Sequence, residues 1–355
     1  MIGVESELLS SKPLASAKVC WLMSRNLREI RILGILILFL ISIVGCSQLT
    51  IGSSPTTTYM PTHTYSPTNA IQSMPIEQTP TTLSGKIAFV SSLDGIDEIF
   101  IVDLINNQVI GPLMTEGVFN QSPVWSPNGD EIAYASDRGT RGSFFDIFIM
   151  SIDGEDVFRL TSDESKWDRQ PTWSPDGMSI AFTHYYFDAL MNSDIYIVDR
   201  FGENQLSITN TELPEEHPSW SPADDVIAFL YQENEEVDKQ YVYLMSVDGS
   251  DRRKLINIEA DGIITWAPDG QQLAFSARRD IYIVNIDGSG GHYLLDEDEY
   301  YLYSPTWSPD GQFIAYKSPN NELDITVADL SGKIVYTISI DSKYGWQLLD
   351  IAWSP

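Results

Sequence analysis

A twelve-residue motif recurs along the chain and constrains its fold more than any other feature. Residues 171–182 read PTWSPDGMSIAF and residues 305–316 read PTWSPDGQFIAY. Looser copies cover residues 123–134, 218–229 and 264–275, and a truncated copy, IAWSP, covers residues 351–355. The tryptophans of the six copies are Trp125, Trp173, Trp220, Trp266, Trp307 and Trp353. Their spacings of 48, 47, 46, 41 and 46 residues fit a four-stranded propeller blade.

Each repeat divides into four predicted strands. The Pro-Thr-Trp-Ser stretch is the first strand, and the Ser-Pro-Asp-Gly turn leads to the Ile-Ala-Phe strand, because Pro and Gly suit successive positions of a tight turn. The third strand is rich in β-branched and aromatic residues. It recurs at residues 97–103, 146–150, 194–199, 241–245, 280–284 and 324–328. A polar turn such as Asp153-Gly154 then leads to a short fourth strand.

The two ends of the repeat region are each incomplete. Residues 86–90 read as a second strand with no Trp-Ser-Pro motif before them, whereas residues 351–355 hold a first strand whose second strand is missing. Together they make one blade. The sequence therefore predicts an all-β, six-bladed propeller over residues 85–355, closed by pairing of the C-terminal strand with the N-terminal strands, so that no sheet edge is left free.

The segment before the repeats has the pattern of an export signal followed by a tether. Arg25, Arg28 and Arg31 precede the apolar run 35–44, which is too short to span a bilayer and suits a secretory signal. Met23 would give a signal of conventional length, so the true start is open. Residues 46–84 are rich in Ser, Thr and Pro and are predicted to be a disordered tether. A membrane-spanning anchor is the alternative for the apolar run.

Two resemblances refine this picture. The Trp-Ser-Pro-Asp-Gly, Ile-Ala-Phe and Asp-Ile-Tyr-type elements resemble the propeller repeat of the TolB family, which is related in architecture to WD-repeat propellers. TolB also carries an α/β domain before its propeller, where this chain has only the predicted tether. The sequence Ile43-Val44-Gly45-Cys46 resembles the lipobox of bacterial lipoproteins. That resemblance implies that residues 1–45 are removed as a signal peptide and that Cys46 is lipidated. It places the propeller outside the cytoplasm, anchored to the cell membrane.

The repeated residues are interpreted as scaffold. A tryptophan that recurs at one position of every blade is expected to fill space between blades, and the Asp of Ser-Pro-Asp-Gly is expected to be a turn residue. No Gly-x-Ser-x-Gly elbow and no calcium-loop spacing occurs in the sequence. The histidines are far apart in the sequence, at positions 63, 184, 217 and 292. The sequence predicts no catalytic residue, no metal site and no cofactor.

Charge is the clearest pointer to a partner. The net charge is −29, and removal of residues 1–45, which contain five basic and three acidic residues, leaves −31. Such a surface repels nucleic acid and favours basic protein patches. Solubility alone is the competing explanation.

The loops at one end of the propeller are the predicted binding face. The segments 162–170, 211–217 and 296–303 are long and irregular, and aromatic residues among carboxylates are typical of recognition surfaces. The alternative is ordinary solvated loops. The candidate partner-binding residues are Trp167, Asp168, Glu215, Glu216, His217, Tyr300, Tyr301 and Tyr303.

The resulting prediction is a monomeric, non-enzymatic, lipid-anchored propeller that binds a protein or peptide with a basic patch on its acidic loop face. The alternatives are an enzyme whose site lies at the mouth of the central channel, and a protein that binds or processes carbohydrate there, with tyrosines stacked on sugar rings.

Overall fold

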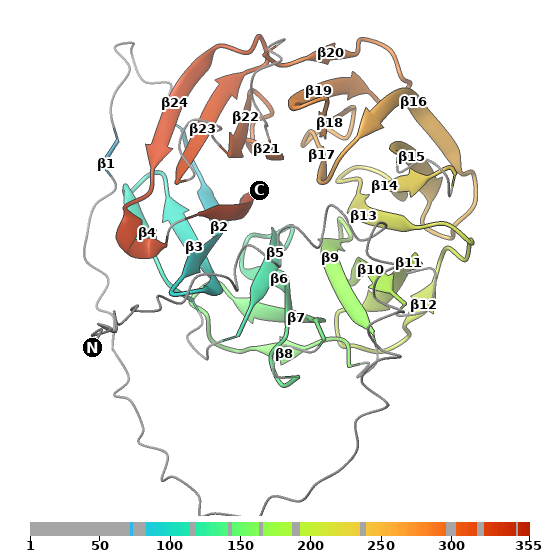
Figure 1. Cartoon of the computed structure of the whole chain (residues 1–355), viewed down its shortest axis with the longest axis horizontal. Helices are drawn as coiled ribbons and strands as arrows, with labels where there is room; N and C mark the ends of the chain where they lie inside the picture. Colours follow the sequence, from blue (N-terminus) through green and yellow to red (C-terminus); the bar gives the residue numbers. More distant parts are fainter. Residues whose placement is uncertain are drawn as a thin grey trace, which may run out of the picture. The chain divides into compact units, whose positions relative to one another are not determined.

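The computed structural model confirms the six-bladed propeller. It describes residues 72–73, 83–113, 118–140, 144–162, 166–186, 192–234, 239–295, 303–317, 323–345 and 347–355. All of these belong to one compact unit, Ser66–Pro355. Six antiparallel sheets are arranged in a circle, each with its first strand innermost (Figure 1). The predicted signal peptide, Cys46 and most of the tether lie outside the described residues.

The blades are numbered along the chain, and their strands are given from the innermost outward. Blade 1 comprises β25 (Leu348–Trp353), β2 (Lys86–Leu93), β3 (Ile96–Asp103) and β4 (Gln108–Ile110). Blade 2 comprises β5 (Asn120–Trp125), β6 (Glu131–Ser136), β7 (Asp146–Ser151) and β8 (Phe158–Arg159). Blade 3 comprises β9 (Trp167–Trp173), β10 (Ser179–Tyr185), β11 (Ser193–Asp199) and β12 (Leu206–Ser207).

The remaining blades follow the same order. Blade 4 comprises β13 (Glu215–Trp220), β14 (Val226–Gln232), β15 (Gln240–Ser246) and β16 (Arg253–Ala260). Blade 5 comprises β17 (Ile264–Trp266), β18 (Gln272–Ala277), β19 (Asp280–Asn285) and β20 (His292–Tyr293). Blade 6 comprises β21 (Tyr303–Trp307), β22 (Phe313–Lys317), β23 (Asp324–Asp329) and β24 (Ile334–Ser339), and the short β1 (Gln72–Ser73) pairs with β24. Among the described residues the single helical element is the 3-10 turn η1 (Ser342–Tyr344).

Blade 1 joins segments from opposite ends of the repeat region. β25 pairs antiparallel with β2, with Ile87 opposite Trp353 and Phe89 opposite Ile351. The turn that would link a first strand to a second strand is absent here, and hydrogen bonds take its place. The Lys86 amide donates to Ser354 Oγ at 2.9 Å, and the Ser354 amide donates to the Lys86 carbonyl at 2.8 Å.

The hydrophobic core lies between blades, because a propeller strand alternates its side chains between the two neighbouring sheets. One face of blade 3, with Ile180, Phe182 and Val198, packs against Ala133 and Ile147 of blade 2. The repeated tryptophans belong to this core. Five of them are at most 8% exposed and Trp220 is partly buried. Trp125 Nε1 also donates to the Ala352 carbonyl of blade 1 at 2.9 Å, which confirms the interblade interpretation.

Hydrogen bonds explain the repeated turn sequence. In blade 3, Ser174 Oγ donates to the Asp176 carboxylate at 2.6 Å and accepts from the Ser179 amide at 2.9 Å. The Met178 amide also donates to Asp176 at 2.9 Å. The hydrogen bond from Ser174 is the main cause that holds the pKa of Asp176 below its usual value. The aspartate is therefore a turn residue, as the sequence predicts.

The glycine between the third and fourth strands brings neighbouring blades close together. At Gly249 of blade 4, φ is 82°, and a Cβ there would lie 2.2 Å from the Ile208 carbonyl oxygen of blade 3. Gly154, Gly202, Gly288 and Gly332 make the same approach to Leu113, Leu160, Leu255 and Leu294 of the preceding blades. No side chain fits at Gly249, because both the backbone conformation and the space exclude it.

Candidate functional site

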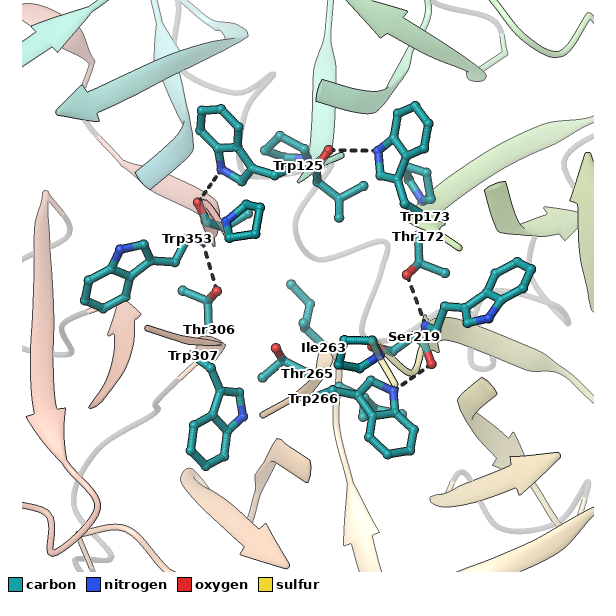
Figure 2. A pocket seen from close by; sticks show the side chains of 18 of the residues that line it. Trp125, Thr172, Trp173, Ser219, Ile263, Thr265, Trp266, Thr306, Trp307 and Trp353 are labelled. Atoms are coloured by element: carbon teal, nitrogen blue, oxygen red, sulfur yellow. Dashed lines mark hydrogen bonds between the residues drawn. The ribbon is translucent and has the colours of Figure 1, made fainter. Parts of the chain in front are cut away.

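The six first strands surround a central channel of about 560 Å³. Figure 2 shows that Ile263 and Thr265 point toward its middle, whereas the tryptophan rings lie outside it between the blades. The strands all run in one direction along the channel, so its two ends differ in chemistry. Prolines of the tight turns line one end, here called the proline mouth: Pro127, Pro175, Pro222, Pro268, Pro309 and Pro355. The residues that precede the repeated motif line the other end, here called the polar mouth: Ser122, Gln170, His217, Ile263 and Asp350.

A β-bulge lies at Ser122, Gln170 and His217 of this mouth. The register between first and second strands shifts just before the motif in blades 2, 3 and 4. Ser122, Gln170 and His217 have φ values of 51°, 56° and 55° there. Positive φ is uncommon for residues other than glycine and is often associated with functional sites. The bulge interrupts the alternation of side chains between the two faces of the sheet. It directs the side chain of the bulged residue toward the axis of the channel.

One wall of the polar mouth is a neutral hydrogen-bond network in blades 3 and 4. Gln170 Oε1 accepts from Thr183 Oγ1 at 2.6 Å, from the His217 amide at 3.1 Å and from Tyr185 Oη at 3.3 Å. These three donors fix the orientation of the amide, so its Nε2 group donates to His217 Nε2 at 2.9 Å. The imidazole must then be neutral. Burial lowers the pKa of His217 to about 4, in agreement with this assignment.

The opposite wall carries Asp350 of blade 1 and Ser122 of blade 2. Asp350 Oδ2 accepts from the Ser122 amide at 3.0 Å. Burial raises the pKa of Asp350, although Ser122 and the charge of Lys317 oppose this shift. Deeper in the same blade, burial raises the pKa of Glu98 to about 8. The polar mouth is therefore asymmetric, with acceptors for a cationic or hydrogen-bonding group on one wall and a fixed neutral network on the other.

The sequence places Asp168 and Glu215 in exposed loops, and this expectation is wrong. Asp168 belongs to β9, is 1% exposed, and its Oδ1 atom lies 2.5 Å from His184 Nδ1. Glu215 begins β13, is fully buried, and accepts from Arg252 Nη1 at 2.5 Å and from Thr211 Oγ1 at 2.7 Å. Burial raises the pKa of Glu215. Both carboxyl groups pack between blades.

The other predicted residues are distributed as follows. Trp167 begins β9 and its ring lies edge-on to Phe145, with centroids 6.2 Å apart. Glu216 is half-buried in β13, where Gln240 Nε2 donates to it at 3.0 Å. Tyr303 begins β21, and Tyr300 and Tyr301 lie outside the described residues.

Among the predicted residues whose side chains the structure describes, His217 is the one that lines the channel. Gln170 and Asp350, which also line the channel, were not among the predicted residues. A usable signal existed, because these residues occupy the same position before the motif as Ser122 and His217, yet their side chains differ from blade to blade. Within the described ranges, no three His, Cys, Asp or Glu side chains gather in a way that could hold a metal ion. Nor does any helix in this part of the chain have the length and apolar character needed to cross a membrane.

The closed arrangement of blades and the repeated turn define a six-bladed β-propeller with an asymmetric channel. A family model for the TolB beta propeller domain matches residues 80–263, more than half of the chain. The chain belongs to this family. A comparison with curated proteins finds no match.

Solved structures share the fold at low sequence identity. TolB from Acinetobacter baumannii is 21% identical, with a TM-score of 0.64, over 78% of this chain and 68% of that chain. A chain of the nidogen/laminin complex is 14% identical, with a TM-score of 0.62, over 76% of this chain and 98% of that chain. Hydrazine synthase from Kuenenia stuttgartiensis is 15% identical, with a TM-score of 0.61, over 76% and 47% of the two chains. These likenesses concern the fold alone.

Proposed function

We propose that this protein is a non-enzymatic, lipid-anchored propeller outside the cytoplasm that binds a protein or peptide at the polar mouth. One observation carries the proposal. At the position before the motif, the six blades carry five different types of side chain on an otherwise repeated scaffold. Variable residues held on a rigid frame are the usual arrangement of a recognition surface.

The charge of the chain supports a basic partner. The net charge of −29 favours the approach of cationic groups, and at the polar mouth Asp350 offers an acceptor to such a group. Charge reversal at Asp168 and Glu215 would not test this site. Asp168 and Glu215 are buried between blades, so their reversal would disrupt packing instead of probing a surface.

The segment before the propeller supports the location. Residues 1–45 have the pattern of a lipoprotein signal, Cys46 would carry the lipid, and residues 46–84 would act as a tether between membrane and propeller. We further propose that the pairing of β25 with β2 closes the ring. The hydrogen bond from Trp353 Nε1 to the Ser84 carbonyl, at 3.0 Å, adds to the strand ladder in support of this role.

Site-specific photocrosslinking in cells tests the proposed binding site. A photoreactive amino acid at Ile263, which lines the polar mouth, should form a covalent adduct with a discrete protein. The same amino acid at Ser289, an exposed turn residue of blade 5, is the control and should not form this adduct. Asp350→Asn should lower the yield from Ile263.

Two outcomes would contradict the proposal. Equal adducts from both positions would show that the polar mouth is not a preferred surface. An adduct from Ile263 that contains carbohydrate and no protein would replace the protein-binding function with a carbohydrate-binding one.

A further inference from the structure

Equivalent positions in the blades act as internal controls for one another, because the same fold requirements apply to each. Blade 3 departs from blades 2, 4, 5 and 6 at two adjacent residues of the turn between third and fourth strands. Most blades place an aliphatic residue first and a polar residue second in this turn. The pairs are Ile152-Asp153, Val247-Asp248, Ile286-Asp287 and Leu330-Ser331 in blades 2, 4, 5 and 6. Blade 3 carries Arg200-Phe201, so the polarity of the turn is exchanged.

The exchange alters the interface between blades 2 and 3. In the other interfaces the aliphatic residue packs into the core, as Ile286 does between blades 4 and 5. Arg200 instead directs its guanidinium to Glu131 of blade 2, where Nη2 lies 2.9 Å from each carboxylate oxygen. A groove of about 260 Å³ lies at this interface, lined by Arg200, Glu131 and Trp173 among others.

Phe201, in the second position of the turn, is 63% exposed. Three further apolar residues in blades 2 and 3 are exposed, at positions where blades 4 and 5 carry polar residues. Met178 is 48% exposed, where blades 5 and 6 have Gln271 and Gln312. Leu206 is 63% exposed and Phe158 is 46% exposed, where blades 4 and 5 have Arg253 and His292.

These residues come from neighbouring segments. The Arg200 amide donates to the Met178 carbonyl at 3.0 Å, so the two turns of blade 3 lie side by side. A Cβ at Gly202 would lie 2.8 Å from the Leu160 carbonyl, which places the Phe201 turn against the end of the strand that contains Phe158. Single exposed apolar residues are ordinary, whereas a group of them beside a groove indicates an interaction surface.

We propose that Phe158, Met178, Phe201 and Leu206, together with the groove beside Arg200, form a docking surface for a basic amphipathic segment of a partner protein. The surface belongs to the turn side of the propeller, away from the polar mouth, and is independent of the function proposed there. We refer to it as the blade 2/3 surface.

The charges around the blade 2/3 surface indicate which kind of segment it would bind. Exposed carboxylates surround the blade 2/3 surface: Asp130 and Asp176 in the tight turns, and Glu203 two residues after Phe201. Arg200, at the groove, is already paired with Glu131. A segment with apolar side chains on one face and Lys or Arg beside them would complement both features. A second copy of this chain would bring its own net charge of −29 to the contact and be repelled.

The test uses the full chain and a synthetic amphipathic helix of Leu and Lys as the probe. The double variant Met178→Gln, Phe201→Asp introduces residues that the sister blades already carry, so it should fold normally. It should weaken probe binding about tenfold or more, as truncation of central apolar contacts commonly does. Hydrogen exchange should show protection at residues 174–178 and 200–206 when the probe binds the unmodified protein.

The matched control is Ile105→Asp. Ile105 occupies the same turn position in blade 1 and is 72% exposed, but it lies outside the blade 2/3 surface. Its replacement should leave probe affinity within about twofold. A Lys and Gln helix of the same charge should bind weakly to every variant, because the apolar contribution is then missing.

Three results would overturn the proposal. One is unchanged affinity in the double variant, and another is an equal loss in Ile105→Asp. The third is a dimer in sedimentation equilibrium that the double variant abolishes, which would assign the surface to self-association. Asp350→Asn, at the polar mouth, should not affect probe binding, so failure here is distinguishable from failure of the proposed function.

Discussion

In blades 2 to 6, a single glycine determines how closely each blade can approach the preceding one. Gly249 combines two demands, a φ of 82° and a carbonyl oxygen 2.2 Å from the place of a Cβ. Gly95, in the turn between β2 and β3, has a φ of 83° but no atom within 4 Å of that place. The two residues share a backbone conformation and differ in packing, so together they separate strain from crowding.

Substitution of these glycines by alanine should give clearly different losses of stability. Gly95→Ala should lower the free energy of unfolding by about 1 kcal/mol, from left-handed strain alone. Gly249→Ala should cost about 3 kcal/mol, because the methyl group must also displace the Ile208 carbonyl. Urea denaturation measures both losses of stability, compared between variants whose free energy of unfolding falls with the same slope against urea concentration. Equal losses would show that the blades can separate without penalty at this contact.

The strands show where sequence reasoning succeeds and where it fails. The second and third strands were predicted well, because their apolar residues and flanking turns repeat in each blade. The inner strands begin earlier than predicted. β9 starts at Trp167 and β13 at Glu215, but the bulges at Gln170 and His217 interrupt the alternation by one residue. A strand with such an interruption looks like an irregular loop in sequence, so the buried Asp168 and Glu215 were taken for surface residues.

β25 offers a direct test of an element shared between distant segments. Deletion of residues 351–355 removes Trp353, which is 6% exposed, and leaves the inner edge of β2 unpaired at Ile87 and Phe89. The loss of a buried tryptophan should lower the melting temperature by roughly 10 °C and broaden the transition. Deletion of the exposed Pro355 alone is the control and should change little. A truncated protein that melts as sharply and as hot as the full chain would exclude ring closure by β25.

At the scale of the whole molecule, the architecture could be predicted because six copies of one sequence pattern must pack alike. A strand that is ambiguous in one copy can be assigned from the equivalent strand in the others. The residues of the polar mouth could not be predicted in the same way. Gln170 meets His217 from the neighbouring blade, 47 positions along the chain, and such a contact depends on the closed arrangement of the blades. The repeated positions form the scaffold, whereas the polar mouth is built from positions whose side chains vary between blades.

The location of the whole chain can be tested at one residue. If Cys46 carries a lipid, Cys46→Ser should move the protein from the membrane fraction to the soluble fraction and abolish labelling with a radioactive fatty acid. Cys20→Ser is the matched control, since Cys20 falls in the predicted signal peptide, and it should leave both properties unchanged. Membrane retention of Cys46→Ser would favour a membrane-spanning anchor formed by the apolar run.

The contact between Ile87 and Trp353 also sets an order of events during synthesis. β2, β3 and β4 leave the ribosome early, yet their inner partner β25 emerges only after the other five blades have been made. Blade 1 is therefore finished last, and until then the inner edge of β2 is available for incorrect pairing. A chaperone that shields the inner edge of β2 while the rest of the chain is made would prevent this incorrect pairing.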